Sequence, residues 1–150
     1  MVSNKAWLFT IIGGWALIAA ASSTLEVYRD FAGPERWFDV RSVTVSDAQE
    51  GVSPRISVDR TIHQPFLGFW HAVVRNVSDG TNSVVCLADG NTSYSPDAKI
   101  PPGANVDWLM QPTQCRLPPG RYRLDLLWRI LPPGYPEKQV YRTSNVFEIR

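Results

Sequence analysis

The sequence predicts an all-β domain that follows one apolar N-terminal helix. From residue 37 onward, short apolar or alternating runs are separated by clusters of turn-forming residues. None of these runs places apolar residues at the 3.6-residue spacing of an amphipathic helix. The run RYRLDLLWRI (121–130) instead has apolar side chains at five alternate positions. Short strands at such spacing are typical of sandwiches and barrels, and we expect a single Greek-key β-sandwich of about seven strands over residues 37–150.

The N-terminal residues 1–25 indicate a membrane anchor or a secretory signal. One charge, Lys5, precedes an apolar run over residues 6–25, and a helix of this length spans about 30 Å, the thickness of a bilayer core. The alanines at 19–21 before Ser22 also fit the cleavage pattern of a signal peptide. Because the lysine stays inside, both interpretations place the domain in the periplasm or outside the cell, held on the cytoplasmic membrane by the helix or secreted after cleavage.

Residues 26–36 then resemble a short linker that ends in a Gly-Pro turn. The chain has 15 basic and 14 acidic residues, and Lys5 belongs to the N-terminal segment, so the remainder is neutral. Nucleic acid binding requires a concentrated basic surface. We therefore expect no nucleic acid partner.

The first three expected strands occupy the first half of the domain. WFDVRSVTV (37–45) ends at the polar cluster SDAQEG. RISVDRTI (55–62) alternates Ile56, Val58 and Ile62 with polar residues and should have one solvated face. PFLGFWHAVVRNV (65–77) is apolar on both faces, which predicts a central strand that is covered on both sides near its middle.

The second half of the domain begins at the turn SDGTN (78–82), which predicts a hairpin with the strand SVVCLA (83–88). A long polar connection, DGNTSYSPDAKIPPG (89–103), precedes the strand NVDWLMQP (105–112). The final pair comprises 121–130 and QVYRTSNVFEI (139–149), joined by a proline-rich loop. Within 121–130 the alternation places five residues in the core: Tyr122, Leu124, Leu126, Trp128 and Ile130.

The residues before this strand read L-x-P-G-x-Y and comprise Leu117, Pro119, Gly120 and Tyr122. This pattern resembles the tyrosine corner of immunoglobulin-like and fibronectin type III sandwiches. The resemblance implies that the hydroxyl of Tyr122 bonds to the backbone a few residues upstream. It names a fold family and no function. The chain departs from antibody domains at Leu124, where those domains have the second cysteine of their inter-sheet bridge.

Cys86 and Cys115 are the only cysteines. An even pair in an exported protein predicts a disulfide. Two buried free thiols are the alternative. A zinc site is disfavoured, because two cysteines 29 positions apart lack the close spacing of zinc ligands, and we expect no metal or cofactor.

The candidate binding residues are aromatic. Tyr94 and Tyr135 fall in the two longest expected loops, where rigid sandwiches often carry binding residues. Trp108 lies in an expected strand, where a core position is favoured over a ligand platform. The strand face that carries Arg121, Arg123 and Arg129 is interpreted as solvated, because Asp125 interrupts the basic row.

No catalytic constellation is recognisable. His63 and His71 are the only histidines, and no nucleophile elbow, phosphate loop or calcium loop is present. We therefore expect a protein that is not an enzyme and that binds another envelope protein or surface component. An accessory product of a phage or mobile element would suit this small layout. A carbohydrate-binding module is the main alternative, and a hydrolase is a distant one.

Overall fold

The computed structural model describes Thr24, residues 27–111 and residues 115–150. The chain divides into two units, Met1–Ala32 and Gly33–Arg150, and all strands of the described residues belong to the second. The predicted apolar helix over residues 6–25 lies outside the described residues except for Thr24. In the part of the chain that is described, no helix is both long and apolar enough to cross a membrane. Within the expected linker, residues 27–31 are helical and Pro34–Arg36 forms the short helix η1.

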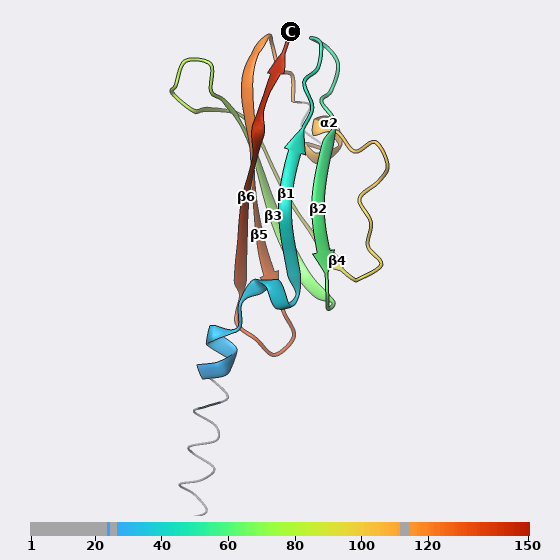
Figure 1. Ribbon diagram of the computed structural model, residues 1–150, viewed down its shortest axis with the longest axis vertical. Coiled ribbons are helices and arrows are strands. Elements are labelled where there is room, and N and C mark those ends of the chain that lie inside the picture. Colours follow the sequence, from blue (N-terminus) through green and yellow to red (C-terminus); the bar gives the residue numbers. More distant parts are fainter. Residues whose placement is uncertain (1–23, 25–26, 112–114) are drawn as a thin grey trace, which may run out of the picture. The chain divides into compact units, whose positions relative to one another are not determined.

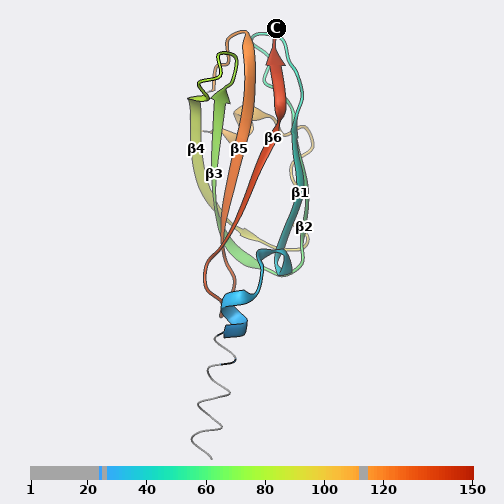
Figure 2. The same cartoon turned by 60° about the vertical axis from the view of Figure 1, so that its left-hand side comes forward.

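The second unit is all-β, as predicted, and its strands form two antiparallel sheets (Figure 1). One sheet pairs β1 with β2, and the other has the order β4-β3-β5-β6 (Figure 2). The described residues contain six strands, where about seven were expected. Their bounds are β1 Phe38–Val45, β2 Ile56–Ile62, β3 Phe66–Asn76, β4 Ser83–Tyr94, β5 Gly120–Leu131 and β6 Lys138–Ile149.

Strand β5 supplies the centre of the core. Its five alternating apolar side chains are all buried, with at most 4% of any one exposed, so the predicted inward face is confirmed. Trp128 makes an edge contact with Phe38 of β1, with ring centroids 5.4 Å apart, and the neighbouring strand β3 contributes the equally buried Ala72 and Val74. Burying five such side chains contributes on the order of 10 kcal/mol gross before chain entropy is subtracted.

The tyrosine corner is present at the start of β5. The hydroxyl of Tyr122 donates a hydrogen bond to the carbonyl oxygen of Pro118 (2.7 Å), which confirms the contact implied by the resemblance. A Cβ atom at Gly120 would lie 3.2 Å from Oγ of Ser78 and 3.3 Å from the hydroxyl oxygen of Tyr122, so this position is tightly packed. The predicted disulfide is also confirmed: Cys86 on β4 is bonded to Cys115, just before the corner.

The segment 105–112 was predicted to be a strand, and this prediction is wrong. Val106–Leu109 forms a single helical turn, α2. The side chain of Asn105 accepts a hydrogen bond from the backbone N–H of Trp108 (2.8 Å), which is the bond that caps a helix at its first turn. Val106 is the one fully buried residue of the four, and Met110, which caps the C-terminus of α2, is also completely buried.

Strand β4 is longer than predicted. It continues through the polar sequence DGNTS to Tyr94 and pairs with β3 along its whole length. The polar and glycine residues of this stretch predicted a loop. In an edge strand, however, such side chains can stay in contact with water while the backbone pairs with the neighbouring strand. The backbone register with β3, rather than side-chain hydrophobicity, determines where β4 ends.

Candidate functional site

An aromatic pocket lies at the edge of the sandwich between β2 and β4. It has a volume of about 360 Å³. The connection that follows β4 runs beside these two strands (Figure 1) and supplies part of the wall. We call this cavity the aromatic pocket. Its lining comprises Ile56, Val58, Arg60, Trp70, Thr92, Ser93, Tyr94, Ala98, Lys99, Ile100, Pro101, Trp108, Leu109, Leu126 and Trp128.

Two glycines allow aromatic rings of the pocket to lie flat on the sheet backbone. A Cβ atom at Gly90 would lie 2.6 Å from Cζ2 of Trp70, and one at Gly68 would lie 2.7 Å from Cε2 of Tyr94. Both distances are shorter than van der Waals contact. Glycine inside a strand often marks such a close approach, and here it makes room for the indole of Trp70 and the phenol of Tyr94.

Tyr94 is held in the core rather than on a loop tip. It ends β4, is only 5% exposed and stacks on Phe66 with ring centroids 4.8 Å apart. Burial raises the pKa of its hydroxyl, and the charge of Arg60 partly opposes this rise. The prediction that Tyr94 lies in a loop is therefore wrong, although it does line the aromatic pocket.

Trp108 forms part of the pocket wall from α2. It was expected in the core of a strand, but its side chain lies on the helix and is 44% exposed. The cap from Asn105 fixes the turn that carries it. Because the ring is both exposed and part of the lining, Trp108 is available to contact a ligand.

Tyr135 lies elsewhere. Its ring makes an edge contact with Trp37, with centroids 4.7 Å apart, and the guanidinium of Arg36 lies 5.5 Å from its centroid. It lines neither described pocket. The three aromatic residues proposed from the sequence therefore do not form one site: Tyr94 and Trp108 share the aromatic pocket, and Tyr135 is separate from it.

Arg60 is the residue of this pocket that the sequence reasoning missed. It lies two residues after Val58 and two before Ile62, on the core-facing side of β2. Its guanidinium lies 5.3 Å from the ring centroid of Tyr94 and 5.9 Å from that of Phe38. Burial lowers the pKa of Arg60. A charged residue at an inward position of the alternation RISVDRTI was the signal that could have identified it.

Two of the three arginines in the row on β5, Arg123 and Arg129, form ion pairs. Asp125 is 6% exposed and accepts hydrogen bonds from Arg75 (2.8 Å) and Arg123 (3.1 Å). Arg129 pairs with Glu137 at 2.7 Å. Arg123 and Arg129 are therefore already paired with carboxylates of the same chain.

A second surface is the outer face of the four-stranded sheet, opposite the core. The register places Leu87 beside Val73 and Tyr141 beside Leu127. Leu87 is 58% exposed and Tyr141 is 53% exposed. The outward residues in the middle of β3, Phe69, His71 and Val73, are half-buried, so β3 is only partly covered on this side. We call this surface, centred on Val73, Leu87, Leu127 and Tyr141, the outer sheet face.

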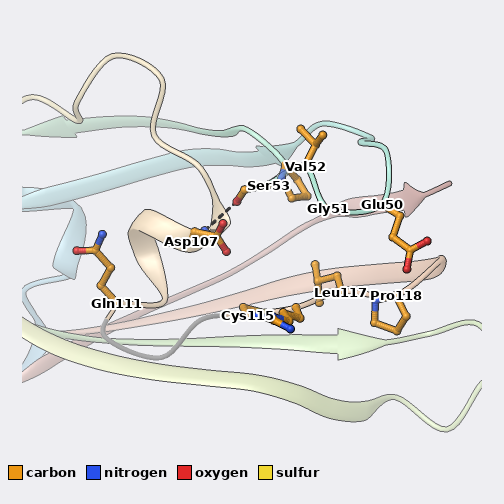
Figure 3. Close-up of a pocket in the computed structure, with 11 residues that line it drawn as sticks. Glu50, Gly51, Val52, Ser53, Asp107, Gln111, Cys115, Leu117 and Pro118 are labelled. Atoms are coloured by element: carbon orange, nitrogen blue, oxygen red, sulfur yellow. Dashed lines mark hydrogen bonds between the residues drawn. The ribbon is translucent and has the colours of Figure 1, made fainter.

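Another depression lies between the loop after β1, the start of α2 and the segment before β5 (Figure 3). The backbone N–H of Asp107 donates to Oγ of Ser53 (3.0 Å) across its wall. Neither His63 nor His71 lines it or the aromatic pocket. Among the described residues, no three His, Cys, Asp or Glu side chains are grouped to hold a metal.

Comparisons with protein-family models, with curated proteins and with solved structures found no match to this chain. The aromatic pocket and the outer sheet face are therefore assessed from their own chemistry.

Proposed function

We propose that this protein is an immunoglobulin-like binding domain that is held outside the cytoplasmic membrane and recognises another envelope protein. The sheet order β4-β3-β5-β6 supports the immunoglobulin-like assignment, as does the hydrogen bond from Tyr122 to Pro118. The disulfide between Cys86 and Cys115 is in keeping with an oxidising compartment. The apolar run over residues 6–25 supplies the anchor or signal in this proposal.

The observation that carries the proposal is the apolar character of the outer sheet face. The solvated face of an antiparallel sheet is normally polar. Here Leu87 and Tyr141 are more than half exposed, and Val84 and Val146 extend the surface at 55% and 44% exposure. The buried ion pairs of Asp125 lie within this face and add fixed polar groups. The register also places charged residues on this face, among them Arg75, Arg123 and Arg129, so the exposed apolar side chains form a patch beside charged groups, as at many protein interfaces.

Site-specific photo-crosslinking tests this function. A photoreactive amino acid is placed at Leu87 or at Tyr141 in the full chain, in the cells that produce it. We expect each to crosslink to one envelope protein, which mass spectrometry then identifies. The same label at Thr44, an exposed position on β1, serves as the control and should give no such product.

Two results would contradict this function. Equal crosslinking from Thr44 would mean that the outer sheet face has no special role. A product consisting only of two copies of this chain would indicate self-association instead. In support, Leu87→Arg should abolish the crosslink from Tyr141 while leaving the unfolding temperature nearly unchanged, because Leu87 is mostly exposed.

Carbohydrate binding is the second candidate function, and the three tryptophans of the aromatic pocket favour it. Aromatic faces pack against sugar rings, and the exposed ring of Trp108 would be the platform. Binding of the full chain to envelope polysaccharide that is lost in Trp108→Ala, and retained in Tyr135→Ala, would support it. Absence of polysaccharide binding together with a protein crosslink would exclude it in favour of the first function.

A further inference from the structure

The aromatic pocket contains positive charge without a matching acidic group. Arg60 and Lys99 are the charged residues of its lining, which includes no Asp or Glu. No ion pair joins Arg60 to a carboxylate among the described residues. A guanidinium stays charged in proteins, and desolvating it without an acidic partner costs free energy. The rings of Phe38 and Tyr94 and the hydroxyl of Tyr94 offset part of that cost without neutralising the charge.

The rest of the lining restricts the kind of ligand that fits. A volume of about 360 Å³ corresponds to roughly a dozen water molecules at about 30 Å³ each, the small end of the range for ligand pockets. Aliphatic side chains such as Ile56, Ile100 and Leu126 share the wall with the indoles. Hydroxyl groups come only from Thr92, Ser93 and the phenol of Tyr94. The other polar side-chain groups of the lining, Arg60, Lys99 and the indoles, are donors only, so the side chains offer a polyhydroxylated ligand few hydrogen-bond acceptors.

We propose that the aromatic pocket binds a small organic carboxylate with a flat apolar body. The carboxylate pairs with Arg60, which lies on the inward face of β2. The body lies against the indoles of Trp70, Trp108 and Trp128, and Lys99 adds positive charge from the segment that follows β4. This inference does not depend on the proposed function, because the outer sheet face lies on the opposite side of its sheet from the core.

Naphthoate is a suitable probe, because it combines a flat apolar body with one carboxylate. Its binding to the full chain in bilayer nanodiscs is measured by titration calorimetry, with empty nanodiscs as the blank. Naphthylmethanol has the same body without the charge, and glucuronate has the carboxylate on a sugar. We expect saturable binding of naphthoate that is about ten- to hundredfold tighter than that of naphthylmethanol, the range for a charge-assisted hydrogen bond. Glucuronate should bind more weakly than naphthoate.

Variants test whether Arg60 is the residue that binds the carboxylate of naphthoate. Arg60→Gln should reduce the affinity for naphthoate about tenfold or more and leave that for naphthylmethanol nearly unchanged. Arg60→Lys should restore part of the loss. Arg41→Gln is the matched control, because Arg41 is an exposed arginine on the neighbouring strand that pairs with Asp59. Lys99→Gln, at an exposed position, should give a smaller loss.

Three outcomes would overturn the inference. Naphthylmethanol that binds as tightly as naphthoate would show that charge is not recognised. Unchanged naphthoate affinity in a folded Arg60→Gln variant would remove the assigned partner. Glucuronate that binds more tightly than naphthoate would identify a sugar site instead. The comparison between the two naphthyl probes uses the native chain, so it decides the charge requirement even where Arg60→Gln fails to fold.

Discussion

The two lateral edges of the sandwich are joined in different ways. At one edge β1 lies against β6, and the side chain of Asn145 bonds to both the N–H and the C=O of Val45, each at 2.9 Å. Arg142 adds a hydrogen bond to the carbonyl oxygen of Val40 (2.7 Å). At the other edge, between β2 and β4, a backbone hydrogen bond links Ile56 to Ala104 near the start of β2, and farther along the aromatic pocket occupies the gap.

This difference suggests separate roles for the two edges: the β1–β6 edge stabilises the domain, and the β2–β4 edge holds the proposed binding pocket. A β-bulge in β6 leaves Ser144 and Asn145 out of register with β5, and Ser144 then satisfies the backbone N–H of Leu124 (3.0 Å). Because of the same bulge, the side chain of Asn145 can form hydrogen bonds with the backbone of β1, in place of the backbone hydrogen bonds of a paired strand. No such device closes the β2–β4 edge along its length, so aromatic and basic side chains there remain accessible to a ligand.

The largest expected effect concerns the disulfide, which ties edge strand β4 to the segment before β5. Replacing Cys86 and Cys115 together by Ala should lower the free energy of unfolding by about 3 kcal/mol, because the bridge restricts the unfolded chain over a separation of 29 residues. Urea unfolding of the full chain without reductant measures this. A double variant as stable as the native chain would show that the bridge contributes nothing.

At the open edge, Gly90→Ala should cost about 1–3 kcal/mol, as overpacking does, because the added Cβ meets the ring of Trp70 at 2.6 Å. The tryptophan fluorescence should change as well, since the indole must move. Asn91→Ala, at the next and exposed position, is the control. Equal stability and unchanged emission in Gly90→Ala would contradict the close approach.

At the closed edge, Asn145→Ala should cost about 1–2 kcal/mol, because two hydrogen bonds to Val45 are lost together. The binding of naphthoate should not change, since Asn145 is not part of the aromatic pocket. Thermal unfolding and calorimetry on the same preparation measure both quantities. Loss of naphthoate binding with stability retained would mean that the two edges are not independent in the way proposed.

The smallest effect is expected at the tyrosine corner, which lies at one end of β5. Tyr122→Phe should lower the free energy of unfolding by about 1 kcal/mol, because the hydrogen bond to Pro118 is lost while the buried ring stays. Chemical denaturation is precise enough to detect this change. A variant with native stability would show that the hydroxyl contributes no net free energy.

Sequence reasoning succeeded where a local pattern has one structural solution. The strict alternation from Tyr122 to Ile130 could bury only one face, and the cysteine pair had one partner each. It failed at Tyr94, where the surrounding polar residues looked like a loop, and at Trp108, where the run NVDWLMQP looked like a strand. A backbone register with β3 and a single capping bond from Asn105 decided those positions, and neither is visible in hydrophobic periodicity.

The sequence by itself determined the all-β class, the central strand β5, the corner at Tyr122 and the pairing of Cys86 with Cys115. Only the tertiary structure decided that Arg60 enters an aromatic pocket without an acidic partner and that the outer sheet face is left apolar and exposed. The physical reason is that a period of two residues assigns side chains to a face, whereas the elements that pack on that face come from distant parts of the chain.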